Sequence, residues 1–94
     1  FCEFGKVKHI IGIENWDVSN VKNMSGMFYD CENFNSDLSK WNVSKVENMK
    51  DMFSYCYNFN SDLSKWNVSE VTDMKYMFHD CKSLKTIPFW YKNK

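Results

Sequence analysis

The chain has 94 residues with 12 basic and 12 acidic side chains, so its formal net charge is zero and it lacks the basic stripe expected of a nucleic-acid-binding protein. Hydrophobic residues make up 44% and aromatic residues 18% of the chain, which argues against intrinsic disorder. No apolar run is long enough to insert into a membrane. We expect one domain spanning 1–94 that binds no cofactor. Because the chain begins with Phe1 rather than Met, we expect it to be a piece of a longer protein. The missing signal peptide therefore says nothing about where that protein is located.

A repeat of 25 residues organises the chain, beginning with the tryptophans at Trp16, Trp41 and Trp66. Other residue types keep the same interval, namely Met24, Met49 and Met74, Phe28, Phe53 and Phe78, and Cys31, Cys56 and Cys81. The units are a partial unit 1–15, the repeats 16–40, 41–65 and 66–90, and a tail 91–94. Self-similarity at this period predicts units that stack to bury a continuous core.

The first element expected in each unit is a short helix, which we describe for the middle repeat. Its apolar residues fall on one face at helical spacing, namely Val46, Met49, Met52, Phe53 and Cys56. Ser44 is suited to be the N-cap, and Glu47 three residues later completes a capping box. We therefore predict a helix of about three turns over 44–56.

The second element expected in each unit is extended chain. Phe59, Ser61 and Leu63 alternate with polar residues at a period of two, and the alternation resumes at Trp66. Stacking would place equivalent extended segments side by side as a parallel sheet, with the helices on the other face. The pattern therefore predicts an α/β solenoid.

The string W-N-V-S-x-V-x-x-M-x-x-M-F-x-x-C, repeated every 25 residues, resembles the leucine-rich-repeat-like units of the BspA-like family. Related arrays occur in mycoplasma and other bacterial surface lipoproteins. The closing stretch 77–88 is also similar to that family's repeat unit, and the resemblance covers roughly residues 9–90. It implies a right-handed solenoid of leucine-rich-repeat type on a cell surface, with no enzymatic activity and a role in adhesion or recognition.

Both ends of the array depart from the repeat. In residues 9–15, His9 and Gly12 replace the phenylalanine and aspartate of the other units, and Trp90 follows Trp66 by one residue less than the period. Terminal units are expected to be atypical because they cap the stack. Neither end is polar enough for a full cap, so we expect either continuation in a parent protein or end-to-end self-association.

The three repeat-equivalent cysteines are predicted to be buried free thiols. Equivalent residues in adjacent helical layers lie roughly 10 Å apart, which is beyond the roughly 7 Å limit on Cα separation in a disulfide. Cys2 lies outside the repeat and has no assigned role.

The triplet His79-Asp80-Cys81 resembles catalytic chemistry, but its aspartate and cysteine recur with the repeat and its histidine is expected to face outward. A zinc site needs several ligands at short spacing, and the cysteines are 25 residues apart while His9 and His79 lie in different units. The sequence therefore predicts neither a catalytic site nor a metal site.

Two repeated columns are candidates for recognition. Trp16, Trp41 and Trp66 could stack in the core, which is the commoner fate of aromatic residues, or form an exposed platform. The polar residues expected to face outward are Asp17, Asn42, Asn67, Lys40 and Lys65. These polar groups could satisfy one another in a structural role or form a binding surface.

Two functions follow from these patterns. The first is a recognition module of a bacterial surface protein that binds a protein or a glycan. The second is a structural spacer that projects another domain, which the near-identity of the repeats favours. Variable positions of the predicted helices differ sharply between the repeats, namely Ser25-Gly26, Lys50-Asp51 and Lys75-Tyr76, and we expect a specific task to depend on variable positions rather than on the repeated scaffold.

Overall fold

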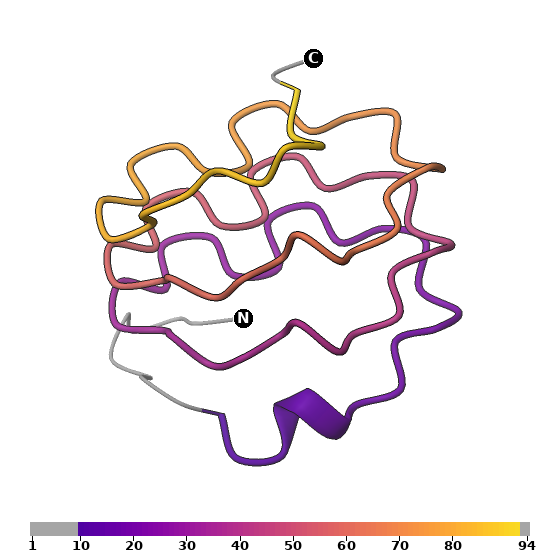
Figure 1. Cartoon of the computed structure of the whole chain (residues 1–94), viewed down its shortest axis with the longest axis horizontal. Coiled ribbons are helices and arrows are strands. Elements are labelled where there is room, and N and C mark those ends of the chain that lie inside the picture. Colours follow the sequence, from indigo (N-terminus) through magenta and orange to yellow (C-terminus); the bar gives the residue numbers. More distant parts are fainter. Residues whose placement is uncertain (1–9, 93–94) are drawn as a thin grey trace.

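The computed structural model describes residues 10–92. In this part of the protein the chain makes successive circuits that are stacked on one another, and we call each circuit a turn of the chain (Figure 1). The only helix in this part of the chain is the 3-10 helix η1, Ile13–Asn15. Strand pairing within it is limited to two isolated parallel bridges, Asn23 with Asn48 and Asn48 with Asp73. The predicted α/β solenoid with a parallel sheet and covering helices is therefore wrong. The molecule is instead compact, with a Cα radius of gyration of 12.0 Å.

The helix predicted over 44–56 is replaced by a series of overlapping turns, and backbone hydrogen bonding explains why. Met52 N–H donates to the Met49 carbonyl at 3.2 Å and closes a turn, whereas Phe53 N–H donates to the Met77 carbonyl of the next repeat at 2.9 Å. Along the segment, backbone N–H groups alternate between donating to a nearby residue and donating to a carbonyl of the next repeat. An α-helix would require each of them to donate four residues back. We call the equivalent segments 24–31, 49–56 and 74–81 the turn wall.

Left-handed backbone conformations recur at two positions of the turn wall in every repeat. The residues are Gly26, Asp51 and Tyr76 at the first position and Asp30, Tyr55 and Asp80 at the second, with φ between 56° and 63°. A residue in this conformation interrupts a right-handed helix and suits the second central position of a tight turn. The apolar spacing that suggested a helix is therefore the inward-facing pattern of a chain of turns.

The predicted sheet does not form because side-chain oxygens accept hydrogen bonds from the backbone N–H groups that would otherwise pair the strands. On the opposite side of the stack lie the segments 34–38, 59–63 and 84–88, which we call the extended wall. Asn60 N–H donates to Asn35 Oδ1 at 2.8 Å, and Leu38 N–H donates to Ser61 Oγ at 3.2 Å. In a sheet these N–H groups would pair with backbone carbonyls of the neighbouring strand.

The core between the two walls is built on stacked phenylalanine rings. Phe53 lies at its centre and is fully buried. Its ring stacks on Phe28 at 5.6 Å, on Phe78 at 5.7 Å and on Phe59 at 4.2 Å, measured between ring centroids. Methionines at Met49 and Met52 are fully buried beside it. Identical residues stack at the repeat period because each unit repeats the same inward-facing positions.

Candidate functional site

The polar column proposed for binding takes part in local turns. Asp17, Asn42 and Asn67 are exposed, and the side-chain oxygen of each accepts the backbone N–H of the serine two residues later, at 3.0 to 3.1 Å. Such turns are a preferred role of Asp and Asn in loops. These residues thus have a structural task that explains their recurrence.

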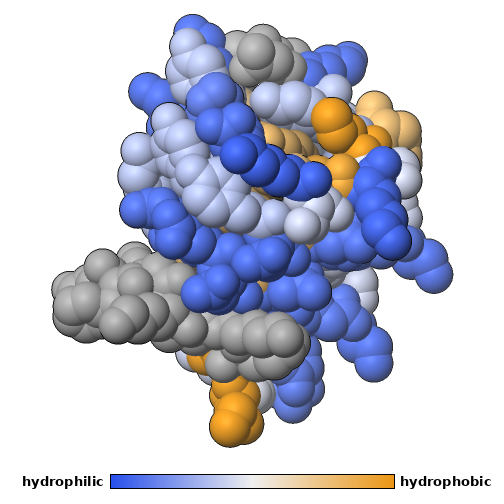
Figure 2. Space-filling model, turned by 90° about the vertical axis from the view of Figure 1, so that its left-hand side faces the viewer, coloured by the Kyte–Doolittle hydropathy of each residue, from blue (hydrophilic) through white to orange (hydrophobic). Residues whose placement is uncertain are grey.

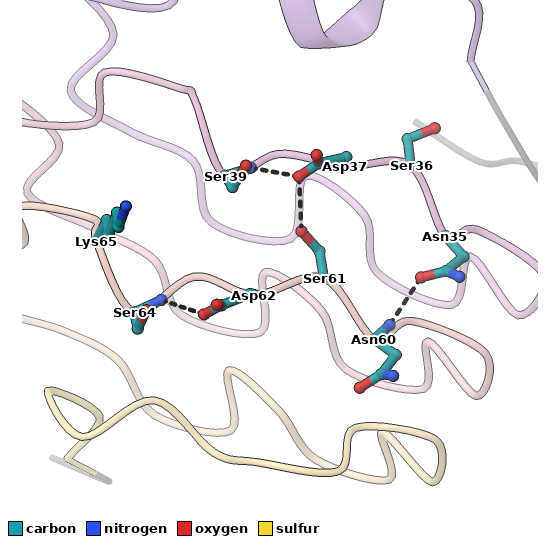
Figure 3. Close-up of a pocket in the computed structure, with 9 residues that line it drawn as sticks. All are labelled: Asn35, Ser36, Asp37, Ser39, Asn60, Ser61, Asp62, Ser64 and Lys65. Carbon is teal, nitrogen blue, oxygen red and sulfur yellow. Dashed lines mark hydrogen bonds between the residues drawn. The ribbon is translucent and has the colours of Figure 1, made fainter.

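The extended wall carries a polar groove of about 420 Å³, shown in Figure 3. It is lined by Asn35, Ser36, Asp37, Ser39, Asn60, Ser61, Asp62, Ser64 and Lys65. Asp37 Oδ1 accepts both the Ser39 N–H at 2.9 Å and the Ser61 hydroxyl at 3.3 Å. Because these polar atoms pair across repeats, they join neighbouring turns of the chain to one another. Lys65 lies at the edge of this groove, and Lys40 is also exposed.

The carboxylates of these turns make stability depend on acidic pH. Hydrogen bonds from Ser39 and Ser64 lower the pKa of Asp37 and Asp62 below the ordinary value of 3.8. A carboxyl whose pKa is lower in the folded than in the unfolded chain stabilises the fold above its unfolded pKa, and this contribution is lost as pH falls through the folded value. We expect the urea concentration at the unfolding midpoint to decrease as the pH is lowered below about 4.

The matched control is the double variant Asp37→Asn/Asp62→Asn, which keeps an oxygen acceptor in each turn but does not titrate. Its urea midpoint, followed by tryptophan fluorescence from pH 7 to pH 2, should fall less steeply on acidification than that of the parent chain. Identical slopes for the two proteins would show that these carboxylates do not couple folding to pH.

The tryptophan column is largely internal. Trp41 and Trp66 are buried, and their indole N–H groups donate to the carbonyls of Ile13 and Leu38 in the preceding turn, at 2.8 and 2.9 Å. Trp90 continues this pattern despite its shifted position in the sequence, since its Nε1 donates to the Leu63 carbonyl at 2.8 Å. Trp16 differs, with 40% of its surface exposed.

The cysteine column corrects one prediction. Cys31 is disulfide-bonded rather than a free thiol. The prediction depended on the spacing of stacked helices, and residues 24–31 form turns rather than a helix. Cys56 and Cys81 are free, and Cys2 lies outside the described residues. The thiol of Cys56 donates to the Phe28 carbonyl at 2.9 Å, and burial raises its pKa to about 12.

The triplet His79-Asp80-Cys81 does not form a nucleophile–base pair. The Cys81 thiol donates to the Phe53 carbonyl at 2.9 Å, and burial raises its pKa to about 12. His79 Nε2 lies 3.8 Å from Asp80 Oδ2 on the surface. Such a thiol is protonated at neutral pH and is therefore a poor nucleophile. Among residues 10–92, no three His, Cys, Asp or Glu side chains are grouped as metal ligands.

A group of exposed and half-buried aromatic side chains lies on the turn wall and directly after its middle segment. We call it the aromatic strip, and its members are Tyr29, Tyr55, Tyr57, Tyr76 and His79. Tyr29 is 47% and Tyr76 is 52% exposed. Ring centroids lie 5.7 Å apart for Tyr29 and Tyr55, 5.3 Å for Tyr55 and His79, and 6.1 Å for Tyr76 and His79. The strip thus joins side chains from three repeats into one continuous surface.

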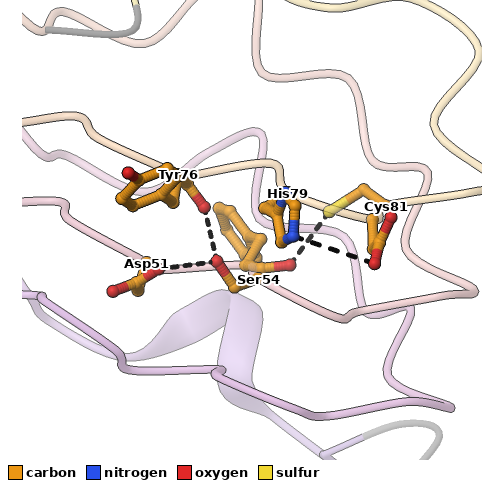
Figure 4. A network of polar contacts seen from close by, with 7 residues as sticks. Asp51, Ser54, Tyr76, His79 and Cys81 are labelled. Carbon is orange, nitrogen blue, oxygen red and sulfur yellow. Dashed lines mark hydrogen bonds and ion pairs between the residues drawn. The ribbon is translucent and has the colours of Figure 1, made fainter.

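All members of the aromatic strip except Tyr57 line a hollow of about 260 Å³, together with Asp51. Beneath it, Ser54 is buried. Its hydroxyl lies 2.9 Å from Asp51 Oδ1 and also within hydrogen-bonding distance of the Tyr76 carbonyl, as Figure 4 shows. The single proton of this hydroxyl is shared between the two acceptors, so Ser54 connects the Asp51 carboxylate with the backbone at Tyr76.

A second exposed apolar group lies at the end of the extended wall, away from the aromatic strip. Phe89 is 84% exposed and Ile87 is 59% exposed, and both line a hollow of about 560 Å³ that continues from the polar groove. On the face in Figure 2, hydrophilic side chains predominate and apolar ones gather mainly toward the C-terminal end of the stack.

Sequence reasoning marked Asp51 and Tyr76 as variable positions but did not predict the aromatic strip, because the members of the strip do not share one repeat position. Tyr29 and His79 occupy equivalent positions in the first and third repeats, Tyr55 lies one position later in the second, and Tyr76 belongs to another column. The signal in the sequence was that the residues of the strip occupy positions at which the repeats differ. Turns rather than helices place these positions on one face.

Comparisons with known proteins identify one family. The family model described as "Mycoplasma protein of unknown function, DUF285" matches residues 2–93, and no curated protein and no solved structure gave a match. The match is compatible with the resemblance to mycoplasma surface repeats and does not confirm leucine-rich repeats of the BspA-like type. Since it covers nearly the whole chain, the chain belongs to this family.

Proposed function

We propose that this member of the Mycoplasma family is a non-enzymatic recognition module of a bacterial surface protein, which binds a protein or a glycan. The aromatic strip is the observation that carries the proposal. Tyrosine is enriched at the centres of binding interfaces because its ring gives a large contact area and its hydroxyl a hydrogen bond. None of the described helices is both long and apolar enough to cross a membrane.

The difference between the recurring and the variable positions of the repeats supports the proposal. Positions that stack in the core or join neighbouring turns recur in each repeat, whereas Tyr29, Ser54 and His79 differ at one equivalent position. Repeat proteins commonly combine a uniform scaffold with a binding surface formed by its variable positions. A purely structural spacer, the alternative, would not need three repeats to contribute different aromatic side chains to one hollow.

The test is a binding array of purified matrix proteins and glycans, probed with the 94-residue chain and the double variant Tyr29→Ser/Tyr76→Gly. Each replacement is the residue that another repeat carries at that position, Ser54 or Gly26, so the backbone should be preserved. We expect saturable binding that the variant weakens at least about tenfold.

The control for this array is Phe89→Ser, which removes an exposed aromatic residue outside the strip and should leave binding unchanged. Native tryptophan fluorescence would verify that all three proteins are folded. Absence of saturable binding by the folded parent chain would support the spacer instead. Equal binding by the parent chain and the double variant would place recognition elsewhere on the surface.

A further inference from the structure

The rings around the hollow are arranged to contact a small group from several sides. Tyr29 and Tyr55 meet at an interplanar angle of 86°, and Tyr55 and His79 meet at 82°. Tyr76 meets His79 at 72°. Edge-to-face pairs of this kind direct ring faces along different directions, so the hollow is not a flat stacking platform. Negative ring faces attract a cation placed over them.

Carboxylates add negative charge at this hollow. Asp51 lines it directly, and Asp80 lies next to His79. The same field acts on Tyr57, because burial and the negative charges of Asp80 and Glu32 raise the pKa of its hydroxyl. The exposed lysines Lys50 and Lys75 precede Asp51 and Tyr76 in the chain, but neither lines the hollow.

The strip already holds one cation of the protein's own. Lys82 Nζ lies 5.1 Å from the centroid of the Tyr57 ring, which is within the range of a cation–π interaction. A ring of this strip and its surrounding charge are therefore suited to an ammonium group. The hollow beside Tyr55 presents more rings and a carboxylate, but its lining contains no basic side chain apart from His79.

We propose that the hollow formed by Tyr29, Tyr55, Tyr76, His79 and Asp51 binds the arginine or lysine side chain of a basic segment on a protein partner. The inference rests on the proposed function and specifies its ligand: a protein rather than a glycan. The cation lies against the tyrosine rings, and the Asp51 carboxylate pairs with its charge. The partner's basic segment is complementary to the negative charge of Asp30, Asp51 and Asp80 on this face.

The test uses two probes of nearly the same shape and different charge: acetyl-Gly-Arg-Gly-amide and the same peptide with citrulline, in which a neutral urea group replaces the guanidinium. Each is titrated into the isotopically labelled 94-residue chain and followed by NMR. We expect the arginine peptide to shift the ring resonances of Tyr29, Tyr55 and Tyr76 saturably. The citrulline peptide should bind at least about fivefold more weakly. Equal affinities for the two peptides, or shifts located elsewhere, would overturn the proposal.

Two variants separate the contribution of charge from that of the rings. Asp51→Asn removes the negative charge but keeps an acceptor for Ser54, and Tyr76→Gly removes a ring at a position where the first repeat has Gly26. Each should weaken binding of the arginine peptide at least about threefold. Phe89→Ser should have no effect. If Asp51→Asn and Tyr76→Gly bind the peptide like the parent chain while remaining folded, the site is not the one proposed.

The failure of this inference can be distinguished from failure of the proposed function. Array binding that depends on Tyr29 and Tyr76, with no preference for arginine over citrulline, would retain the recognition function and reject the cation site. Array binding to glycans alone would do the same. Cosedimentation with phosphatidylcholine vesicles in place of peptide binding would show that the hollow takes a lipid headgroup, and would overturn the protein partner.

Discussion

Replacing Phe53 with alanine is expected to lower the free energy of unfolding by about 4 kcal/mol. Phe53 is fully buried and its ring lies against those of Phe28, Phe59, Phe78 and Trp66, so it joins three repeats. Truncation removes apolar burial and leaves a cavity that rigid neighbouring rings cannot fill. Because small domains are stable by only about 5 to 15 kcal/mol, the variant should unfold at much lower urea concentration.

The measurement for Phe53→Ala is urea unfolding followed by tryptophan fluorescence, since the structure has too little helix for a strong helical signal. Phe53→Leu should be milder because it fills most of the volume. Phe89→Ala is the matched control, because Phe89 is 84% exposed and its loss should change stability by less than about 0.5 kcal/mol. Similar losses for the two alanine variants would contradict a core centred on Phe53.

Replacing Trp66 with phenylalanine is expected to cost about 2 kcal/mol. The change keeps an aromatic ring in the core but removes the indole N–H that donates to the Leu38 carbonyl at 2.9 Å. That carbonyl would still accept the Trp41 backbone N–H at 3.1 Å. The cost is therefore the loss of one buried hydrogen bond together with the apolar burial that the smaller ring no longer provides. The loss should appear as a lower urea midpoint.

Tyr29→Phe provides the control for removing a polar atom from an aromatic side chain. Tyr29 is exposed, so water can replace the interactions of its hydroxyl and stability should change by less than about 0.5 kcal/mol. An equally small effect of Trp66→Phe would indicate that the indole hydrogen bonds do not contribute to joining successive turns of the chain.

The local backbone could not be predicted from the spacing of apolar residues. In 49–56, Met49, Met52, Phe53 and Cys56 are all buried, as an amphipathic helix would have them, yet the segment is a series of turns. The difference depends on where the N–H groups donate, and Phe53 N–H donates to Met77, 24 residues away in the chain. Propensity and capping rules describe local hydrogen bonds and carry no information about this partner.

The candidate site was also beyond the reach of the repeat pattern. Recurrence drew attention to Asp17, Asn42 and Asn67, whose side chains close local turns. The aromatic strip instead depends on residues that break the recurrence, such as Tyr76 and His79. Their proximity follows from left-handed residues in the turn wall, which change the direction of the chain.

The 25-residue period and the residues that recur along it can be read directly from the sequence, because stacked units must repeat the same inward-facing side chains to form one core. The conformation of the backbone between those residues depends on contacts made in the folded chain. Hydrogen bonds between neighbouring turns compete with the local bonds of a helix, and Asn and Ser side chains replace the carbonyl partners of a sheet. These long-range partners fixed the turn wall, and the turn wall in turn brought the aromatic strip together.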